Sequence, residues 1–270
     1  MKRTVTLSFA VTAFAALAAL AQAFAAAPAF EPRQNDFHWR EPLAAGRVIE
    51  IKGVNGNVEA TPASGGEVEV VAVKRARRSN PEDVRIEVVR HADGVTLCAV
   101  YPTPEGREPN TCQPGPNDRS HVQNNDTNVN FTVRVPAGVR FTGKTVNGRV
   151  EAEGLSAEVE ARTVNGGINV STTGLARATT VNGSIRVSMG SVNWSDELAF
   201  KTVNGGIDLS VPASLSARVQ ARTVNGDIST DFPITVTGTF SRRRLSGTVG
   251  AGGRELVLET VNGSVNLRRT

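Results

Sequence analysis

Aromatic residues and cysteine are scarce in this chain of 270 residues, and no stretch after residue 30 has the sustained periodicity of a helix. Aromatic residues make up 5% of the sequence, which contains two cysteines and three histidines, whereas Gly occurs at 26 positions. Few aromatic residues and many Val, Thr, Asn and Gly fit a thin core of small side chains better than a broad globular core. We therefore expect an all-β fold.

The first residues have the pattern of a secretory signal peptide. Lys2 and Arg3 precede an apolar run over residues 5–20, and small residues alternate over residues 21–25. A retained membrane anchor is the alternative, but the run is short and Thr and Ser interrupt it. No cysteine near the cleavage site offers lipid attachment, and no apolar stretch closes the sequence. We expect an exported protein of the periplasm or cell surface, with no transmembrane span in the mature chain.

Charge and histidine content argue against several functions. The formal charge is +4, of which Lys2 and Arg3 contribute two, so bulk charge does not predict binding of nucleic acid or another polyanion. The three histidines lie on separate segments without a Ser or Cys partner in a recognisable motif. We expect no catalytic residue, no cofactor, no metal and no enzymatic activity.

The two cysteines, Cys98 and Cys112, flank a Pro-rich loop. Export permits a disulfide between them. Two reduced thiols are the alternative. A metal site is not expected, because no histidine stands nearby in a ligand-like spacing.

The tetrapeptide Thr-Val-Asn-Gly recurs six times, and a partial copy, Gly-Val-Asn-Gly, stands at residues 53–56. Steps between the six copies are 18, 17, 22, 21 and 37 residues, the last close to two ordinary steps. Such a period indicates one supersecondary unit stacked on copies of itself. The copies begin at Thr145, Thr163, Thr180, Thr202, Thr223 and Thr260.

Each copy lies between two predicted strands. Mostly apolar residues stand four and two positions before the Thr and five and seven positions after it, which is the period of a strand with one buried face. An antiparallel meander is the alternative, because Asn-Gly favours tight hairpins. Successive copies would then alternate in direction, and identical residues would not form columns. The pattern therefore favours units of strand, corner and strand that coil in parallel.

We predict a single-stranded parallel β-helix, or solenoid. The crossover rule favours right-handed coiling, and left-handed coiling is the alternative because the units are about 18 residues long. Its Asn side chains would form a hydrogen-bonded ladder with steps of about 4.8 Å, and its Thr side chains would lie on the inward face. The predicted ladder consists of the six Thr residues named above together with Asn55, Asn147, Asn165, Asn182, Asn204, Asn225 and Asn262.

The chain divides into a signal peptide (1–25), an N-terminal cap or linker (26–45) and a solenoid domain (46–270), whose units are irregular up to residue 137 and regular from 138. Residues 102–128 are rich in Pro, Asn, Asp and Gly and predict a long excursion outside the coil, either a binding loop or surface filler. Further strands are predicted at 67–73, 84–89, 95–100 and 129–135.

Two expectations concern the C-terminal part. The step of 37 residues predicts a degenerate unit near residues 246–250. The chain ends on a well-formed unit, so Arg268 and Arg269 are expected to protect a terminal sheet edge.

One outward column is predominantly basic. Directly before each Thr stand Lys144, Arg162, Thr179, Lys201, Arg222 and Glu259. Like charges on adjacent strands repel, so a retained basic column indicates an anionic ligand such as an acidic polysaccharide or a lipid headgroup. Edge cations that discourage aggregation are the alternative. The candidate ligand-binding residues are Lys144, Arg162, Lys201, Arg222 and, in a loop over residues 188–196, Trp194.

The whole pattern resembles a bacterial family of exported, adhesin-like proteins with a β-solenoid domain. The resemblance covers residues 45–270 and rests on Ile-x-Ile-x-Gly-Val-Asn-Gly-x-Val at 49–58, Val-x-Val-Pro at 133–136 and the serial Thr-Val-Asn-Gly units. It implies the fold but no catalytic residues.

The resulting functional hypothesis is a non-enzymatic envelope protein for adhesion or scaffolding. Its partner would be a polysaccharide, an anionic envelope component or another envelope protein. A carbohydrate-active enzyme on the same scaffold is one alternative and would require acidic side chains that converge in a groove. A polyanion-binding module that uses the basic column is the other.

Overall fold

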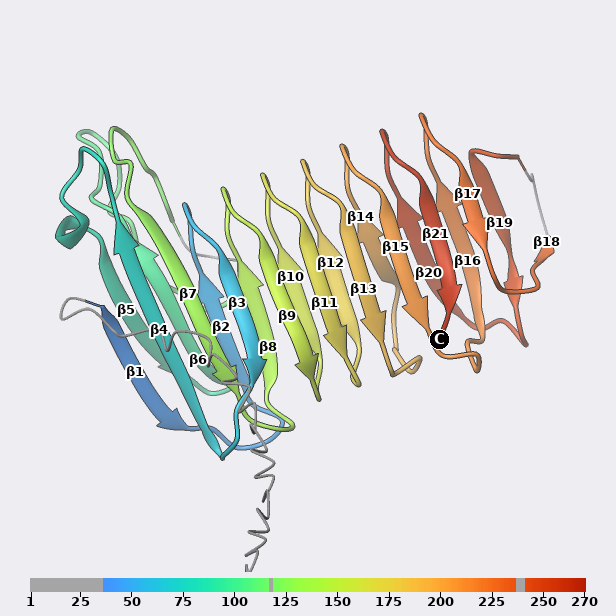
Figure 1. Cartoon of the computed structure of the whole chain (residues 1–270), viewed down its shortest axis with the longest axis horizontal. Coiled ribbons are helices and arrows are strands. Elements are labelled where there is room, and N and C mark those ends of the chain that lie inside the picture. The colour runs from blue at the N-terminus through green and yellow to red at the C-terminus, as the bar shows by residue number, and fades with distance from the viewer. Residues whose placement is uncertain (1–35, 117–118, 237–240) are drawn as a thin grey trace, which may run out of the picture. The chain divides into compact units, whose positions relative to one another are not determined.

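The computed structural model of the chain describes residues 36–116, 119–236 and 241–270 (Figure 1). The predicted signal peptide lies outside the described residues, as does the segment 26–35 of the predicted cap. Among the described residues, no helix is long and apolar enough to cross a membrane.

The described residues form two sheets. The first sheet has the strand order β1-β4-β7-β3-β9-β11-β13-β15-β21-β17, and the second has the order β18-β19-β16-β20-β14-β12-β10-β8-β2-β6-β5. A single turn of 3-10 helix, η1 (Pro81–Asp83), precedes β5. The strands are β1 (Phe37–Pro42), β2 (Val48–Lys52), β3 (Val58–Pro62), β4 (Glu67–Arg75), β5 (Arg85–His91), β6 (Gly94–Val100), β7 (Asn128–Val135), β8 (Arg140–Lys144), β9 (Val150–Leu155), β10 (Val159–Arg162), β11 (Ile168–Thr172), β12 (Ala176–Thr179), β13 (Ile185–Met189), β14 (Leu198–Lys201), β15 (Ile207–Val211), β16 (Ala217–Arg222), β17 (Ile228–Thr230), β18 (Thr235–Val236), β19 (Arg244–Val249), β20 (Arg254–Glu259) and β21 (Val265–Arg269).

The alternating sequence pattern produces these strands. In β11, Ile168 and Val170 are buried and the residues between them are half-exposed, as the period of two requires. The inward residues of both sheets pack into one core of Val, Ile, Leu and Ala, with a few larger side chains such as Phe141 and Phe200. The composition therefore predicted the kind of core correctly.

Seven units consist of a strand in the second sheet, a corner and a strand in the first sheet, and we call them corner units. Neighbouring units pair in parallel and in register, so that Ile185 lies opposite both Ile168 and Ile207. An antiparallel meander of these units is thereby ruled out. Figure 1 shows their corners in one row. In spatial order the units are β2–β3, β8–β9, β10–β11, β12–β13, β14–β15, β20–β21 and β16–β17.

The order of units in space differs from the order in sequence at both ends. The last unit in sequence, β20–β21, lies between β14–β15 and β16–β17, and β21 therefore pairs with β15 and β17 (Figure 1). Arg268 and Arg269 thus pair with residues of β15 instead of forming a terminal edge, so that expectation was wrong. At the other end, β2–β3 lies between β6–β7 and β8–β9.

The degenerate unit predicted near residues 246–250 is not a parallel unit. These residues belong to β19, which pairs with β16 in the antiparallel direction. Alternation of apolar and polar residues indicates a strand but does not show its direction, which explains the error. The irregular part also contains antiparallel strands, since β5 pairs with β6, β4 with β7, and β1 with β4.

The four additional strands predicted before residue 137 are confirmed as β4, β5, β6 and β7. Between β6 and β7, the predicted excursion takes the place of a Thr-Val-Asn-Gly corner. In the predicted N-terminal cap, β1 forms an edge of the first sheet. The bidentate contact of Arg90 on β5 with Glu41 on β1, at 2.6 and 2.9 Å, joins the outermost strands of the two sheets.

Candidate functional site

The Asn side chains of the seven corners form one continuous, directional ladder. Each Nδ2 donates a hydrogen bond to Oδ1 of the Asn in the preceding unit, at 2.7–2.8 Å. The ladder follows the spatial order of the units, so Asn262 lies between Asn204 and Asn225. All seven Asn positions predicted from the sequence are therefore brought together in one column.

The Thr residues of the six full copies are buried behind this ladder, with exposed fractions of 1–6%. Each hydroxyl donates to the carbonyl of the corner Gly in the preceding unit, for example Thr163 Oγ1 to Gly148 O at 2.8 Å. The corner carbonyls thereby find donors, which satisfies polar groups that would be costly to bury unpaired. The corner is therefore a structural device that holds neighbouring units in register.

Asn204→Leu is expected to lower the free energy of unfolding by about 1 kcal/mol. The substitution removes two amide hydrogen bonds, with Asn182 and Asn262. Both neighbours are exposed, so water can replace the lost partners and the cost stays moderate. Urea unfolding measures it, with Asn193→Leu as a matched control because the exposed Asn193 side chain makes no amide bond in the ladder. Equal midpoints for both variants would show that the ladder adds no stability.

The predicted basic column is present on the second sheet, but carboxylates neutralise part of its charge. Lys144 contacts Glu50 at 2.7 Å and Arg162 contacts Glu160 at 2.6 Å. Insertion of β20–β21 places Glu259 between Lys201 and Arg222, at 3.9 and 3.8 Å from them. The four cations predicted to bind a ligand therefore each have an anionic neighbour within the chain.

Trp194 is not available to a ligand, which corrects its prediction as a contact residue. Its side chain is 3% exposed, and its indole N–H donates to the carbonyl of Glu255 at 3.1 Å. An aromatic residue in a surface loop suggests exposure, but here the ring packs against the core. Its role is to pack the loop between β13 and β14.

The excursion is attached to the second sheet by a disulfide and by a cluster of polar groups. Cys98 on β6 and Cys112 in the excursion form a disulfide. Lys52 on β2 is 5% exposed, and its ammonium group donates to the carbonyls of Gln113 and Gly115, both at 2.5 Å. Glu50, also 5% exposed, accepts from the Gly115 N–H at 3.1 Å. The excursion therefore supplies hydrogen bonds that these buried charges require.

Two groups near the excursion have perturbed acidity. Burial raises the pKa of Tyr101 to about 12, and hydrogen bonds from Asn55 oppose the shift only in part. The Tyr101 hydroxyl donates to the carbonyl of Thr127 at 2.7 Å. The backbone N–H of Ser79, supported by its side chain, holds the pKa of Asp126 below its usual value. Tyr101 thus stays neutral and Asp126 stays ionised at ordinary pH, and both fix the excursion.

A groove of about 660 Å³ on the outer face of the second sheet contains acidic side chains, the feature that an enzyme would need. Its lining includes Glu50, Glu160 and His91. Glu50 is engaged by Lys144 and by the Thr96 hydroxyl, and Glu160 is engaged by Arg162. The His91 ring contacts Thr96 Oγ1 at 3.2 Å. Glu50 and Glu160 are therefore held by neighbouring side chains, and Asp93 is a third carboxylate in the lining.

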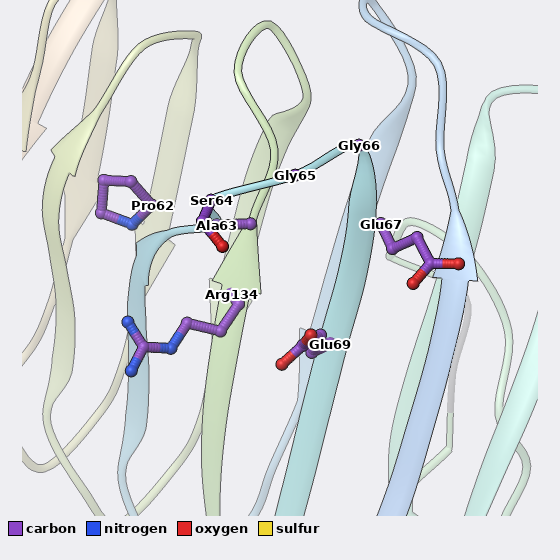
Figure 2. A pocket seen from close by; sticks show the side chains of 8 residues that line it. All are labelled: Pro62, Ala63, Ser64, Gly65, Gly66, Glu67, Glu69 and Arg134. Atoms are coloured by element: carbon purple, nitrogen blue, oxygen red, sulfur yellow. The ribbon is translucent and has the colours of Figure 1, made fainter.

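A second hollow, of about 490 Å³, lies at the turn between β3 and β4 (Figure 2). Figure 2 shows the Arg134 side chain directed away from Glu69 and towards Pro62. Glu69 instead contacts Arg40 at 2.6 Å. The hollow is lined by charges of both signs, so we assign no ligand to it.

The valines of the corners form an exposed apolar column that the sequence reasoning did not single out. Their exposed fractions are 37–51%, whereas Val54, in the unit next to the excursion, is only 9% exposed. The signal was present in the sequence, because a buried Thr in extended chain places the following Val on the outside. We call this column together with the Asn ladder the corner ridge, and its valines are Val146, Val164, Val181, Val203, Val224 and Val261.

Several solved structures are similar to the chain in fold. A candidate cell adhesion protein from Clostridium sporogenes matches 87% of this chain and 100% of its own, with 12% identity and a TM-score of 0.44. Candidate adhesins from Bacteroides fragilis and Parabacteroides distasonis match 88% and 87% of this chain and 99% and 97% of their own. Their identities are 12% and 11%, and their TM-scores are 0.28 and 0.29. At these values the neighbours do not indicate a ligand.

No curated protein matches the chain. The Toastrack DUF4097 family model matches residues 47–268. This range includes all seven corner units and the excursion. The chain therefore belongs to the Toastrack DUF4097 family.

Proposed function

We propose that this chain is a non-enzymatic, exported binding protein of adhesin type, and that its corner ridge holds an uncharged linear polysaccharide. The observation that carries the proposal is the column of six valines with exposed fractions of 37–51% beside the Asn ladder. Exposed apolar residues that lie singly are ordinary, whereas a continuous apolar strip rimmed by polar groups is typical of an interaction site.

The ladder adds hydrogen-bonding capacity to this strip. An Asn amide has two N–H donors and an oxygen with two lone pairs. Within the ladder each of the five interior Asn residues uses one donor and one acceptor, as in the Asn182 to Asn165 contact at 2.8 Å. One N–H and one lone pair per unit are therefore left for a ligand, at intervals of about 4.8 Å. A polymer with hydroxyl groups on alternating polar and apolar faces matches such a periodic surface.

The charges beside the ridge favour an uncharged polymer over a polyanion. The cations of the neighbouring column are balanced by Glu50, Glu160 and Glu259. On the other side of the ladder, Gly167, Ser184 and Gly206 leave the middle of the row uncharged, and the column carries one cation, Arg149, and one anion, Asp227, towards its two ends. A polyanion would therefore meet little net positive potential along the ridge.

The finer features of the architecture belong to the same proposal. We infer that the corner units coil as a single-stranded parallel β-helix, and the in-register parallel pairing of successive units supports this coil. Right-handed coiling follows from the general rule for parallel crossovers. The leader pattern in the sequence supports export to the periplasm or cell surface.

The test compares two triple variants in the same three units. Val164→Ser, Val181→Ser and Val203→Ser remove apolar surface from the ridge. Arg162→Ser, Thr179→Ser and Lys201→Ser change the adjacent column and serve as the matched control. Co-sedimentation with cellulose, chitin and curdlan, and retention on alginate, measure binding of residues 36–270.

We expect binding to at least one of the three uncharged polymers, and a loss of affinity on the order of tenfold in the valine variant. The control variant should bind as the parent does. If the control variant alone loses affinity for the polymers and the parent chain is retained on alginate, the basic column is favoured as the binding site and the proposal is overturned. Absence of binding to all three uncharged polymers would also count against it.

A further inference from the structure

Three consecutive arginines form a turn at the end of the row of corner units. They are Arg242, Arg243 and Arg244, all exposed, and we call them the arginine turn. The carbonyls of Arg243 and Arg242 accept hydrogen bonds from Thr223 N and Ile228 N, both at 3.0 Å. The turn is therefore attached by its backbone to the corner unit β16–β17, which leaves its side chains in solvent.

The arginine turn differs from the other basic positions of the second sheet because its charges are not neutralised. Among the described residues, no carboxylate lies within 4.0 Å of these three guanidinium groups, whereas Lys144 and Arg162 have close acidic partners. Arg244 also lies directly opposite Arg222 in the antiparallel pair of β19 and β16, and Arg222 contacts Glu259 at 3.8 Å. The guanidinium groups of the turn therefore add uncompensated positive charge to this end of the sheet.

An exposed apolar side chain stands next to this charge. Val224, with an exposed fraction of 51%, is the most exposed valine of the corners. Val224 follows Thr223, whose backbone N–H is bonded to the turn. Clustered arginines beside exposed apolar residues are typical of a surface that contacts anionic bilayers.

We propose that the arginine turn, with Val224, docks the chain onto a bilayer that carries anionic phospholipid headgroups. A soluble polyanion would use the guanidinium groups alone, whereas a bilayer also receives the apolar side chain, and this favours lipid. The guanidinium groups donate paired hydrogen bonds to phosphate oxygens. This docking shares Val224 with the corner ridge, but its charged contacts lie at the end of the row of units, outside the three units that the ridge variants change.

The experiment measures co-sedimentation of residues 36–270 with vesicles of phosphatidylcholine, alone or mixed with phosphatidylglycerol. This segment holds every described strand and the core, and it omits the apolar run at 5–20, which would itself bind lipid. One variant carries Arg242→Ser, Arg243→Ser and Arg244→Ser. The matched control replaces three separate exposed arginines, Arg47, Arg107 and Arg186, with Ser. A third variant replaces the turn with three Lys residues.

We expect binding to vesicles with phosphatidylglycerol at low salt, and at least about a tenfold loss in the Ser variant of the turn. The control should stay within about twofold of the parent and the Lys variant within about fivefold, since charge supplies most of the attraction. Thermal melting verifies that all variants are folded. Equal binding by the Ser variant and the control would overturn the proposal. Binding to soluble alginate through the turn without vesicle binding would also overturn it, in favour of an acidic polysaccharide.

Discussion

Gly166→Ala is expected to destabilise the chain by more than about 3 kcal/mol, or to prevent folding. A Cβ atom on Gly166 would overlap the carbonyl oxygen of Gly148 and would lie 2.5 Å from the carbonyl carbon. These atoms belong to the backbone of the neighbouring unit and cannot rotate away. Relief would require the two units to separate, which breaks the ladder bond from Asn165 to Asn147 and the bond from Thr163 to Gly148 O.

The adjacent Gly167→Ala is the matched control, because it makes the same chemical change one residue further along the chain. Its Cβ would meet Ser184 O at 3.4 Å, an ordinary van der Waals distance, and its backbone does not require glycine. Urea unfolding should therefore show a small change for Gly167→Ala and a large loss for Gly166→Ala. Similar midpoints would mean that neighbouring corners can move apart without cost.

The corner columns could be predicted from the sequence because the same four letters recur at the same phase of the strand pattern. Identical residues in identical local structure form columns only if the units stack in parallel, and the structure has this pairing, for example Asn147 with Asn165. The Thr and Asn positions thus followed from periodicity alone. The composition likewise indicated the thin aliphatic core.

The order of the units could not be predicted in the same way. Every corner presents the same Thr and Asn side chains, so the hydrogen bonds of the corner can form whichever two units are neighbours. The structure inserts β20–β21 before β16–β17, and this change moves Glu259 between Lys201 and Arg222. A column that appears basic in sequence order is therefore partly neutralised in space.

The candidate surfaces were missed for a different reason. A Val within a repeated motif resembles a core residue when hydropathy alone is considered, and its exposure follows only once the preceding Thr is placed inside. The arginine turn is visible in the sequence as a charge run, but its lack of acidic neighbours depends on the pairing of β19 with β16. The valine column could therefore have been derived from the inward Thr of the sequence pattern, whereas the arginine turn required the three-dimensional arrangement.

Removal of the disulfide by Cys98→Ala with Cys112→Ala is expected to cost about 3 kcal/mol of stability by the loop-entropy estimate. The two residues are 14 positions apart, so their bond restricts a loop of moderate length in the unfolded chain. Both side chains are at least 92% buried, and Ala introduces no polar group at either site. Addition of reductant should lower the free energy of unfolding of the parent by the same amount. It should leave that of the double variant unchanged.

The native structure suggests that the loss extends beyond loop entropy. Lys52 and Glu50 are each 5% exposed, and the segment just after Cys112 supplies hydrogen bonds to both of them. If this segment moves away, two buried charges lose partners, which costs more than a surface contact. Amide exchange at Gly115, bonded to Glu50 at 3.1 Å, should therefore accelerate in the double variant while exchange in the corner units stays slow. Unchanged exchange at Gly115 would show that the buried charges hold the excursion without the disulfide.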